Sequence, residues 1–509
     1  MSLRIKNILT NRVSKLTLFI FFVLIVSAFF RFYRLEDFAT FLGDQGRDAI
    51  VMKRIVTLEH FPAIGAPSSL GQIYLGPFYY YLVSPFLLLF NFNPVGPVFA
   101  VALLSFLGIL AAFVAIKKEV SDLTALIFLF LTLFSFVNIQ SSRFSWNPNL
   151  LPIFSFFTLY FFYKAFTTES RLFVFLAGAF LAFSFQLHHL AFSLVIPMVL
   201  WYLLLFSRTL KNKIKQDIKQ FILFTASFLL FSLPLILFEL KHNFLNFRNL
   251  LTLISEGNTA NGGGFIASFL LSNQALYTYV FQTATTTLLP FLLTVSLTIF
   301  YLVKNVQKKK FSLVNLHLLN IVFFLVFFSL INTARNAHYY NVIYLSFFVI
   351  LASFSASLDK SKTAKTLVLI LCIGIYLILN IRNLNYLFKP TKSQMSIANK
   401  VAQSIAEHTP KKNFQTIALP NVETDGHIRY FLEIDGYRPL PADTTTPPSE
   451  LFVLCFEKKC EVLGNPQWQI ASFKDAKIDT IWTVEGVKIY KLIHNQQETS
   501  NPNGSQYSN

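Results

Sequence analysis

Two aspartates and an arginine stand close together in the stretch FLGDQGRDAI (residues 41–50), in a chain of which only 13% of residues are charged. Asp44 and Asp48 are four residues apart, so on a helix they lie at neighbouring positions of one face. An aspartate carboxylate can act as a general base and take a proton from an attacking hydroxyl group. The structural alternative makes Asp44 a helix N-cap and Asp48 a solvated first-turn residue, each contributing about 1 kcal/mol or less.

Four other short segments place polar or ionisable residues between apolar runs. They are SSRFSWNPN with Arg143 and Asn147, QLHH with His188 and His189, FELKHNF with Glu239, Lys241 and His242, and NTARNAHYYN with Arg335, His338 and Tyr339. Ionisable groups at membrane depth are costly and usually line a cavity or a substrate path. Capping or headgroup contact explains each segment taken alone. Their common assignment to one membrane face predicts a single polar cavity that opens outward.

The elements that must position these residues are transmembrane helices. The chain has 509 residues, of which 54% are hydrophobic and 60 are Phe, a composition far outside that of soluble globular proteins. The formal net charge of +18 could indicate nucleic-acid binding. The Lys and Arg residues lie mostly in short clusters between apolar runs, however, as the positive-inside rule describes. We therefore interpret this charge as membrane topology and expect no nucleic-acid partner.

Eleven apolar runs are read as membrane spans. They lie near residues 16–30, 94–116, 122–139, 149–166, 172–187, 189–207, 221–238, 276–303, 312–331, 339–357 and 365–382. The first run lacks a small-residue cleavage site, which predicts a retained signal anchor and a cytoplasmic N-terminus. With these spans, every basic loop falls on the cytoplasmic side. The short apolar stretch 76–90 would invert this pattern, so we place it in the interface or the outer leaflet.

The predicted fold is a membrane α-helical bundle of about eleven spans with outer juxtamembrane helices and a small C-terminal α/β domain. We assign residues 1–383 to the transmembrane domain, with an outer loop at 34–93 that begins an amphipathic helix near Asp44. Residues 384–494 form the extracytoplasmic α/β domain, and residues 495–509 a disordered polar tail. In that domain Cys455 and Cys460 form either a disulfide or two free thiols.

The glycine-rich stretch SEGNTANGGGFIAS (residues 255–268) predicts an outer loop between two spans. Three consecutive glycines, at 262–264, cost too much conformational entropy for the interior of a stable helix or strand. Such a loop could cover a bound substrate, as mobile lids do in other enzymes. A plain flexible connector is the alternative.

A polar cavity bordered by carboxylates and cations suits a lipid-linked anionic donor. Arginine can hold a phosphate with bidentate geometry, while a carboxylate takes the proton of an acceptor hydroxyl. This chemistry is glycosyl transfer from a polyprenyl phosphate, by an inverting displacement without a covalent intermediate. We expect Arg335 and His338 to contact the donor phosphate, with Arg143 and Lys241 as lesser candidates.

Four stretches of the chain resemble the lipid-dependent GT-C glycosyltransferases, specifically the protein mannosyltransferase and aminoarabinose transferase group. They are the acidic first outer loop, YLGPFYYYL with Tyr79 (residues 74–82), FSWNPNLLPIF (144–154) and AHYYNVIYL (337–345). The resemblance covers roughly residues 15–360. It implies that Asp44 is the catalytic base. The family pattern is Asp-Glu where this chain has Asp44 and Gln45, which leaves Asp48 as a rival. Asn147 stands where members often have aspartate, so a second acid and any metal ligation stay open.

We therefore predict a multi-pass plasma-membrane glycosyltransferase that moves a hexosyl or pentosyl group from a polyprenyl-phosphate donor to an outer-face acceptor. Asp44 and Asp48 are the catalytic candidates. The substrate-binding candidates are Arg47, Tyr79, Arg143, Asn147, His188, His189, Glu239, Lys241, His242, Arg335, His338 and Tyr339. The expected partners are the lipid bilayer, the lipid-linked donor, and a glycan, lipid or protein acceptor. No cofactor is assigned, and a divalent cation stays open.

Two other classes of function compete with this prediction. A transporter or flippase of lipid-linked or anionic substrates would also need many spans and a polar cavity. Transporters often show internal repeats and polar sites near the bilayer midplane. This sequence has no such repeat, and its polar residues gather at one face. An assembly or scaffold role for the outer domain is the third reading.

Overall fold

The structure is a computed structural model. It describes residues 15–68, 73–206, 214–256, 264–308, 312–331, 333–358, 363–409, 413–420, 422–441 and 444–495. The chain divides into two compact units: the first comprises Met1–Phe38 and Met52–Pro390, and the second Ala39–Val51 and Thr391–Asn509. Helix α4 (Gly43–Val56) therefore begins in the second unit and ends in the first.

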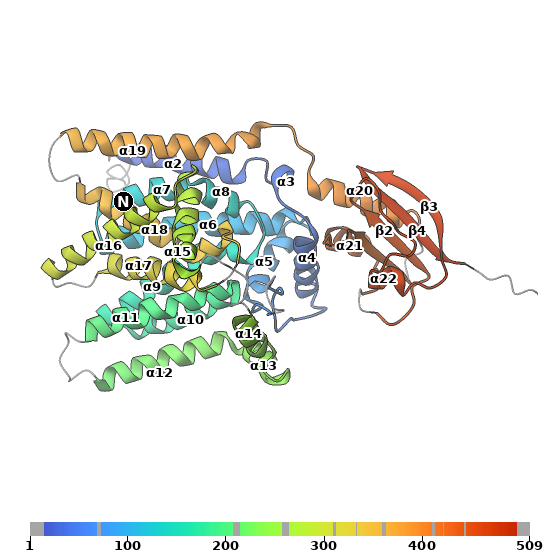
Figure 1. The fold of residues 1–509 in the computed structure, drawn as a ribbon, viewed down its shortest axis with the longest axis horizontal. Helices are drawn as coiled ribbons and strands as arrows, with labels where there is room; N and C mark the ends of the chain where they lie inside the picture. The colour runs from blue at the N-terminus through green and yellow to red at the C-terminus, as the bar shows by residue number, and fades with distance from the viewer. Residues whose placement is uncertain are drawn as a thin grey trace, which may run out of the picture. The chain divides into compact units, whose positions relative to one another are not determined.

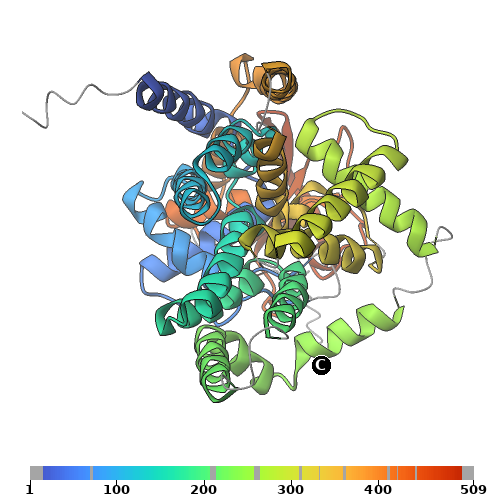
Figure 2. The same cartoon turned by 90° about the vertical axis from the view of Figure 1, so that its left-hand side faces the viewer.

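The first unit is a bundle of helices that lie mostly side by side (Figures 1 and 2). Its α-helices, besides the end of α4, are α2 (Lys15–Phe32), α3 (Leu35–Phe38), α5 (Phe78–Leu89), α6 (Val95–Glu119), α7 (Asp122–Leu133), α8 (Phe136–Ser142), α9 (Leu151–Thr168), α10 (Arg171–Leu187), α11 (Val195–Phe206), α12 (Ile214–Phe231), α13 (Leu233–Lys241), α14 (Leu245–Glu256), α15 (Gly264–Phe281), α16 (Leu288–Lys308), α17 (Leu313–Ser329), α18 (Tyr344–Leu358) and α19 (Thr363–Ile381). Short 3-10 helices are η1 (Asn147–Leu150), η2 (His189–Leu194), η5 (Ala337–Val342) and η6 (Arg382–Phe388).

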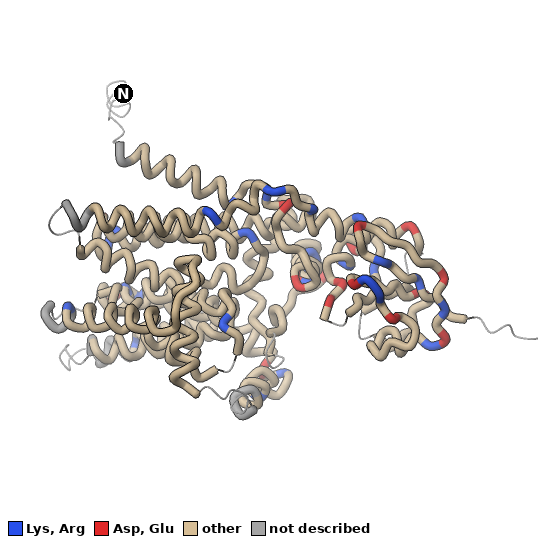
Figure 3. The backbone as a smooth tube through the Cα atoms, turned by 45° about the horizontal axis from the view of Figure 1, so that its top comes forward, with Lys and Arg blue, Asp and Glu red and all other residues tan. Residues whose placement is uncertain are grey.

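Several of these helices are long and apolar enough to cross a bilayer. Within the described ranges, three helical stretches meet that test: Val95–Glu119, Asn147–Thr168 and Leu367–Phe388. The number rises to five if two bent pairs each count as one span, namely α7 with α8, bent by 60°, and α12 with α13, bent by 68°. Lys, Arg, Asp and Glu positions are sparse along the helices of this unit (Figure 3). The polytopic helical fold is thus confirmed, and the number of eleven spans stays a prediction.

The expected single span at residues 276–303 is wrong. The structure has two helices there, because α15 ends at Phe281 and α16 begins only at Leu288. Gln282 takes a positive φ of 54°, which terminates a helix. The following sequence TATTT disfavours helix because β-branched side chains lose rotamer freedom against the preceding turn.

Both ends of the glycine-rich stretch 255–268, where a loop was expected, are helical. Helix α14 extends to Glu256, and α15 begins at Gly264. The remaining residues, 257–263, lie outside the described part of the chain, and so does the predicted tail from residue 496 onward.

The second unit contains a four-stranded sheet with the order β1-β2-β4-β3. The strands are β1 (Phe414–Leu419), β2 (Glu450–Cys455), β3 (Ala476–Val484) and β4 (Val487–His494), and the helices besides the start of α4 are α20 (Gln394–Ala406), α21 (Gly426–Ile434) and α22 (Trp468–Ala471). β1 and β2 are parallel, with Phe414 opposite Glu450. β4 is antiparallel to both β2 and β3. The expectation of a small C-terminal sheet domain is confirmed.

Alternate strand residues of this sheet form one apolar core. Because side chains alternate between the two faces of a strand, Ile417, Val453 and Leu492 lie on the same side, where they pack with Ile470 and Phe473. Cys455 ends β2 and is bonded to Cys460. Of the two states left open for these cysteines, the structure has the disulfide.

Candidate functional site

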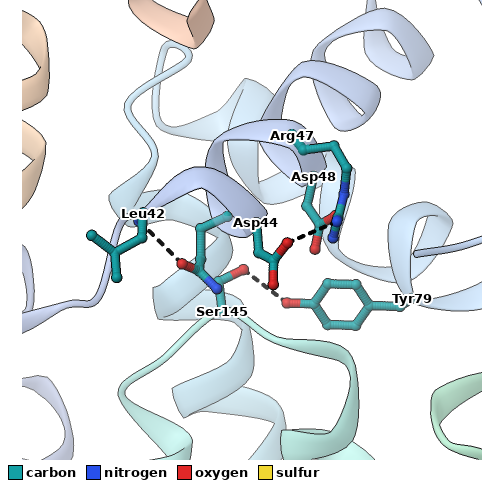
Figure 4. Close-up of polar contacts among 7 residues, drawn as sticks. Leu42, Asp44, Arg47, Asp48, Tyr79 and Ser145 are labelled. Atoms are coloured by element: carbon teal, nitrogen blue, oxygen red, sulfur yellow. Dashed lines mark hydrogen bonds and ion pairs between the residues drawn. The ribbon is translucent and has the colours of Figure 1, made fainter. Parts of the chain in front are cut away.

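The acidic turn is the start of α4. Arg47 Nη1 donates to Asp44 Oδ1 at 2.8 Å, while its Nη2 and Nε donate to Asp48 Oδ1 at 2.8 and 3.0 Å (Figure 4). Gln45 Oε1 accepts the backbone N–H of Leu42 at 3.1 Å, as the glutamate or glutamine of a capping box does. The helix begins at Gly43, so Asp44 is a first-turn residue and not the N-cap.

The two aspartates differ in exposure. The side chain of Asp44 is 58% exposed, that of Arg47 35%, and that of Asp48 only 2%. A buried carboxylate is stable when it is paired and hydrogen-bonded, and Asp48 has this arrangement with Arg47. The exposed carboxylate of Asp44 is the one that a substrate can approach. Arg47 fixes its position from one side.

A second group of predicted residues meets inside the first unit. The ring of His338, on η5, lies 4.7 Å from Trp146, 6.1 Å from His188 and 4.1 Å from Tyr339, measured between centroids. The rings of His188 and Tyr339 are 5.7 Å apart. Three of the polar segments, separated by many residues in the sequence, therefore converge. We call Trp146, His188, His338 and Tyr339 the aromatic cluster.

Asn147 lies next to this cluster in the sequence and is buried without a partner. Its side chain is 1% exposed, and neither amide atom has a hydrogen-bond partner among the described residues. η1, which Asn147 begins, is joined to η5 because Asn341 Nδ2 donates to Pro148 O at 2.7 Å. His189 Nε2 is likewise buried without a partner in the described ranges. Leaving a buried polar group unpaired costs about 1–3 kcal/mol, so such groups are candidates for ligand contact.

Most hydrogen-bond donors of Arg335 bind acceptors within the first unit. Its Nε donates to Ser272 Oγ at 2.9 Å, and Nη1 donates to the carbonyls of Ile331 and Thr333 at 3.1 and 2.6 Å. Nη2 donates to Ser268 Oγ. The guanidinium also lies 4.6 Å from the centroid of the Phe328 ring. Few of its donors are left for a phosphate.

His338 does not supply the positive charge expected of it. Burial lowers the pKa of His338 to about 4, so its imidazole is neutral at neutral pH. The contact of His338 with the donor phosphate stays a proposal. A neutral imidazole can still donate or accept a hydrogen bond.

Arg143 has a structural use that was not expected. Its guanidinium donates to the backbone carbonyls of Phe30, Arg31, Tyr33 and Arg34, at distances from 2.8 to 3.3 Å. These carbonyls belong to the end of α2 and the turn after it, where a helix leaves its last carbonyls unpaired. Arg143 thus caps α2, and we do not carry the phosphate role forward.

The FELKHNF segment forms a turn between two helices. Glu239 Oε1 and Oε2 accept the backbone N–H groups of Asn246 and Phe247 at 3.1 and 3.2 Å, at the start of α14. Lys241 and His242 are exposed. In the described part of the chain, Glu239, Lys241 and His242 make no contact with the aromatic cluster. Tyr79, in contrast, is fully buried and hydrogen-bonds Ser145 Oγ at 2.8 Å, beside Trp146 (Figure 4).

Some residues of this region had no sequence signal of their own. Ser268 and Ser272 lie on α15 within an apolar stretch, and only the fold brings them to Arg335. Asn341 and Ser145 stand inside the quoted segments, and their short polar side chains gave no reason to select them. Among the described residues, no group of three or more His, Cys, Asp and Glu side chains is arranged to hold a metal ion.

Comparisons with known proteins agree with this architecture. Residues 75–237 match the family model described as dolichyl-phosphate-mannose-protein mannosyltransferase. A comparison with curated protein sequences finds no significant match. The fold is similar to that of ArnT from Cupriavidus metallidurans bound to undecaprenyl phosphate, with a TM-score of 0.59, 13% identity, and coverage of 94% of this chain and 98% of that chain. The apo state of the same protein gives a TM-score of 0.61 at the same identity and coverage.

The archaeal oligosaccharyltransferase from Archaeoglobus fulgidus is also similar, with a TM-score of 0.55, 13% identity, and coverage of 84% of this chain and 64% of that chain. These structures share the GT-C glycosyltransferase fold. The resemblance inferred from the sequence is confirmed: the chain has the GT-C fold, and residues 75–237 are similar in sequence to the protein mannosyltransferases.

Proposed function

We propose that this chain is an integral membrane glycosyltransferase that moves a sugar from a polyprenyl-phosphate donor to an acceptor on the outer face of the membrane. The observation that carries the proposal is the acidic turn of α4 in a chain with the GT-C fold. There an exposed carboxylate, Asp44, is fixed by Arg47, which buried Asp48 holds in turn. The similar ArnT structure contains undecaprenyl phosphate, which supports a lipid-linked donor here.

The proposed reaction is a single displacement at the anomeric carbon. The acceptor oxygen attacks that carbon as the bond to the phosphate oxygen breaks, and the lipid phosphate leaves with the electron pair. Asp44 takes the proton of the acceptor hydroxyl, because an ionised carboxylate with an exposed oxygen can act as a general base. The sugar inverts its configuration, since no covalent intermediate forms.

Stabilisation of the leaving phosphate requires a cation. Arg47 and Arg335 are the candidates: Arg47 is 35% exposed and hydrogen-bonded to the proposed base Asp44, and Arg335 is hydrogen-bonded to serines and carbonyls of its own unit. Asn147, His188, His189, His338 and Tyr339 are proposed to hydrogen-bond the donor or acceptor. The unpaired amide of Asn147 is the strongest member of this set, because a ligand would remove the cost of its burial.

The outer-face assignment rests on charge and on the disulfide. Disulfides form and persist in oxidising, extracytoplasmic compartments and are rare in the cytosol. The bond between Cys455 and Cys460 therefore supports an extracytoplasmic C-terminal domain. We keep the cytoplasmic N-terminus as part of this proposal.

The test is a transfer assay with purified full-length protein in lipid. Radiolabelled polyprenyl-phosphate sugars are incubated with a cell-envelope extract, and the component that gains label identifies the acceptor. We expect label to leave the lipid only when active protein is present. Movement of the intact labelled lipid across a bilayer, without transfer of the sugar, would support a flippase and overturn the proposal.

A further inference from the structure

The acidic turn belongs to the same compact unit as the C-terminal domain. Residues Ala39–Val51 group with Thr391–Asn509, although they are far apart in the sequence. The contact that joins them lies between the start of α4 and the start of α21. It is built from glycines, Gly43 and Gly46 on α4 and Gly426 on α21.

These glycines allow two backbones to touch. A Cβ atom on Gly46 would lie under 3.0 Å from the backbone of both Gly426 and His427, closer than real Cβ atoms come. A Cβ on Gly426 would collide with the carbonyl oxygen of Gly43 and lie 3.0 Å from Arg47 N. None of the three has a positive φ, so close approach, and not backbone conformation, requires glycine here.

Phe41, which lies just before α4, packs against α21 at the same contact. Its side chain is 2% exposed. Its ring centroid lies 5.9 Å from that of Tyr430 and 5.7 Å from that of Phe431, both on α21. Its backbone N–H donates to Gln394 Oε1, at the start of α20, at 2.8 Å. The chain that enters the acidic turn is thus fixed by two helices of the C-terminal domain.

Helix α21 is itself tied to the sheet. Asp425 Oδ2 accepts from Arg429 Nε at 2.7 Å, and the Arg429 Nη2 donates to Thr416 O, on β1, at 3.0 Å. Arg429 Nη1 donates to Leu440 O at 2.9 Å. This partly exposed ion pair, with its further hydrogen bonds to two carbonyls, ties α21 to β1 and restricts its movement relative to the β-sheet.

We infer that the C-terminal domain positions the acidic turn for catalysis, and that Gly43, Gly46 and Gly426 are the positioning residues that set the place of Asp44 and Arg47. This inference rests on the proposed function, since it gives the domain a role in that reaction. The glycines touch no substrate. They act by holding the first turn of α4 against α21.

The test compares Gly46→Ala and Gly426→Ala with Gly374→Ala in the full-length protein. Gly374 lies on α19, and a Cβ there meets nothing within 4 Å, so its variant controls for the substitution itself. We expect kcat to fall by about 10-fold to 100-fold in the first two variants, because a misplacement of about 1 Å can cost about 100-fold. The KM for the lipid donor should stay within about twofold, and Gly374→Ala should behave as the wild type.

A second measurement does not depend on activity. Hydrogen–deuterium exchange of residues 43–51 should become faster in Gly46→Ala and Gly426→Ala, while exchange in β2 stays as in the wild type. If either variant fails to fold, Phe41→Leu, which removes the ring contacts but remains apolar, takes its place with the same expectation.

The possible results distinguish failure of the positioning role from failure of the proposed function. Unchanged exchange at residues 43–51, or faster exchange with unchanged kcat, overturns the positioning role. Faster exchange in a protein whose wild type transfers no sugar overturns the proposed function and leaves the docking of α4 on α21 demonstrated. A fall in kcat that is matched by equal loss of exchange protection throughout the domain indicates general destabilisation and also overturns the inference.

Discussion

At the scale of single residues, the structure gives the two aspartates of the acidic turn different environments. Asp44 is exposed and bonded once to Arg47, whereas Asp48 is buried and accepts two donors from the same guanidinium. A base must reach the proton that it takes, so exposure favours Asp44. Burial suits Asp48 to orientation of Arg47.

The first prediction compares Asp44→Asn with Asp48→Asn. The Asp44→Asn variant keeps the size of the side chain and removes its basicity, so turnover should fall by about 100-fold to 10,000-fold, the usual contribution of a general base. The Asp48→Asn variant should lose less turnover, because Arg47 keeps its hydrogen bond to Asp44. Both are measured at equal expression and donor occupancy. A dead Asp48→Asn beside an active Asp44→Asn would reverse the two roles.

A second residue-scale prediction concerns Arg143. In Arg143→Met four backbone carbonyls lose their donors, and hydrogen bonds to a charged group contribute about 1.5–3 kcal/mol each at most. We therefore expect a lower midpoint of thermal unfolding in detergent, with donor affinity unchanged in the folded fraction. A variant of wild-type stability with weakened donor binding would restore the phosphate role that we withdrew.

Much of the acidic turn could be predicted from the sequence, because its residues lie within one helical turn. The spacing of Asp44, Arg47 and Asp48 fixes which of them can meet. The burial of Asp48 could not be predicted, since burial depends on residues that are distant in the sequence. The cap formed by Arg143 shows the same limit, because its carbonyl partners lie more than 100 positions away.

At the scale of elements, local composition predicted most helices and failed where the chain turns. The span expected at 276–303 joined parts of α15 and α16. A hydropathy average along the chain does not detect a short break between helices such as TATTT. For η1 and η5, the sequence predicted only that their segments lie on the same face of the membrane. Their direct contact, through Asn341 and Pro148, depends on how the helices pack.

The α21 element carries a prediction about pH. Burial lowers the pKa of His427 to about 4, and the Asp425 charge and a backbone hydrogen bond to Thr424 oppose this only in part. The unfolded state, with an ordinary histidine pKa near 6.5, binds more protons than the folded state between these values. Stability therefore rises with pH in this window. It is fully present above about pH 6.5 and falls toward pH 4, by about 3 kcal/mol at most.

The measurement is the pH dependence of hydrogen exchange in α21 and β1 of the full-length protein. We expect protection to decrease between pH 6.5 and pH 4, after correction for the intrinsic exchange rate. His427→Gln removes the titrating group and should flatten this dependence. An equally steep dependence in that variant would show that other groups control it.

At the scale of the whole molecule, the chain combines a helical unit with the GT-C fold and a second unit that contains both the acidic turn and the C-terminal sheet. Composition alone predicted a helical membrane domain followed by a small α/β domain. It did not predict that residues 39–51 belong with the second unit, because a contact between glycines leaves no pattern in hydropathy or charge. This assignment makes the C-terminal domain part of the proposed catalytic apparatus, and its side of the membrane then decides where transfer takes place.

The last prediction therefore concerns topology, tested by labelling introduced cysteines in intact cells. The background is Cys372→Ser, because Cys372 is an exposed free thiol, while Cys455 and Cys460 are bonded to each other. Ser472→Cys, at an exposed site after α22, should react with a membrane-impermeant maleimide. Lys118→Cys, in the basic last turn of α6, should react only after lysis, because the positive-inside rule places that turn in the cytoplasm. The reverse pattern would put Asp44 and the disulfide on the cytoplasmic side, and transfer at the outer face would then be excluded.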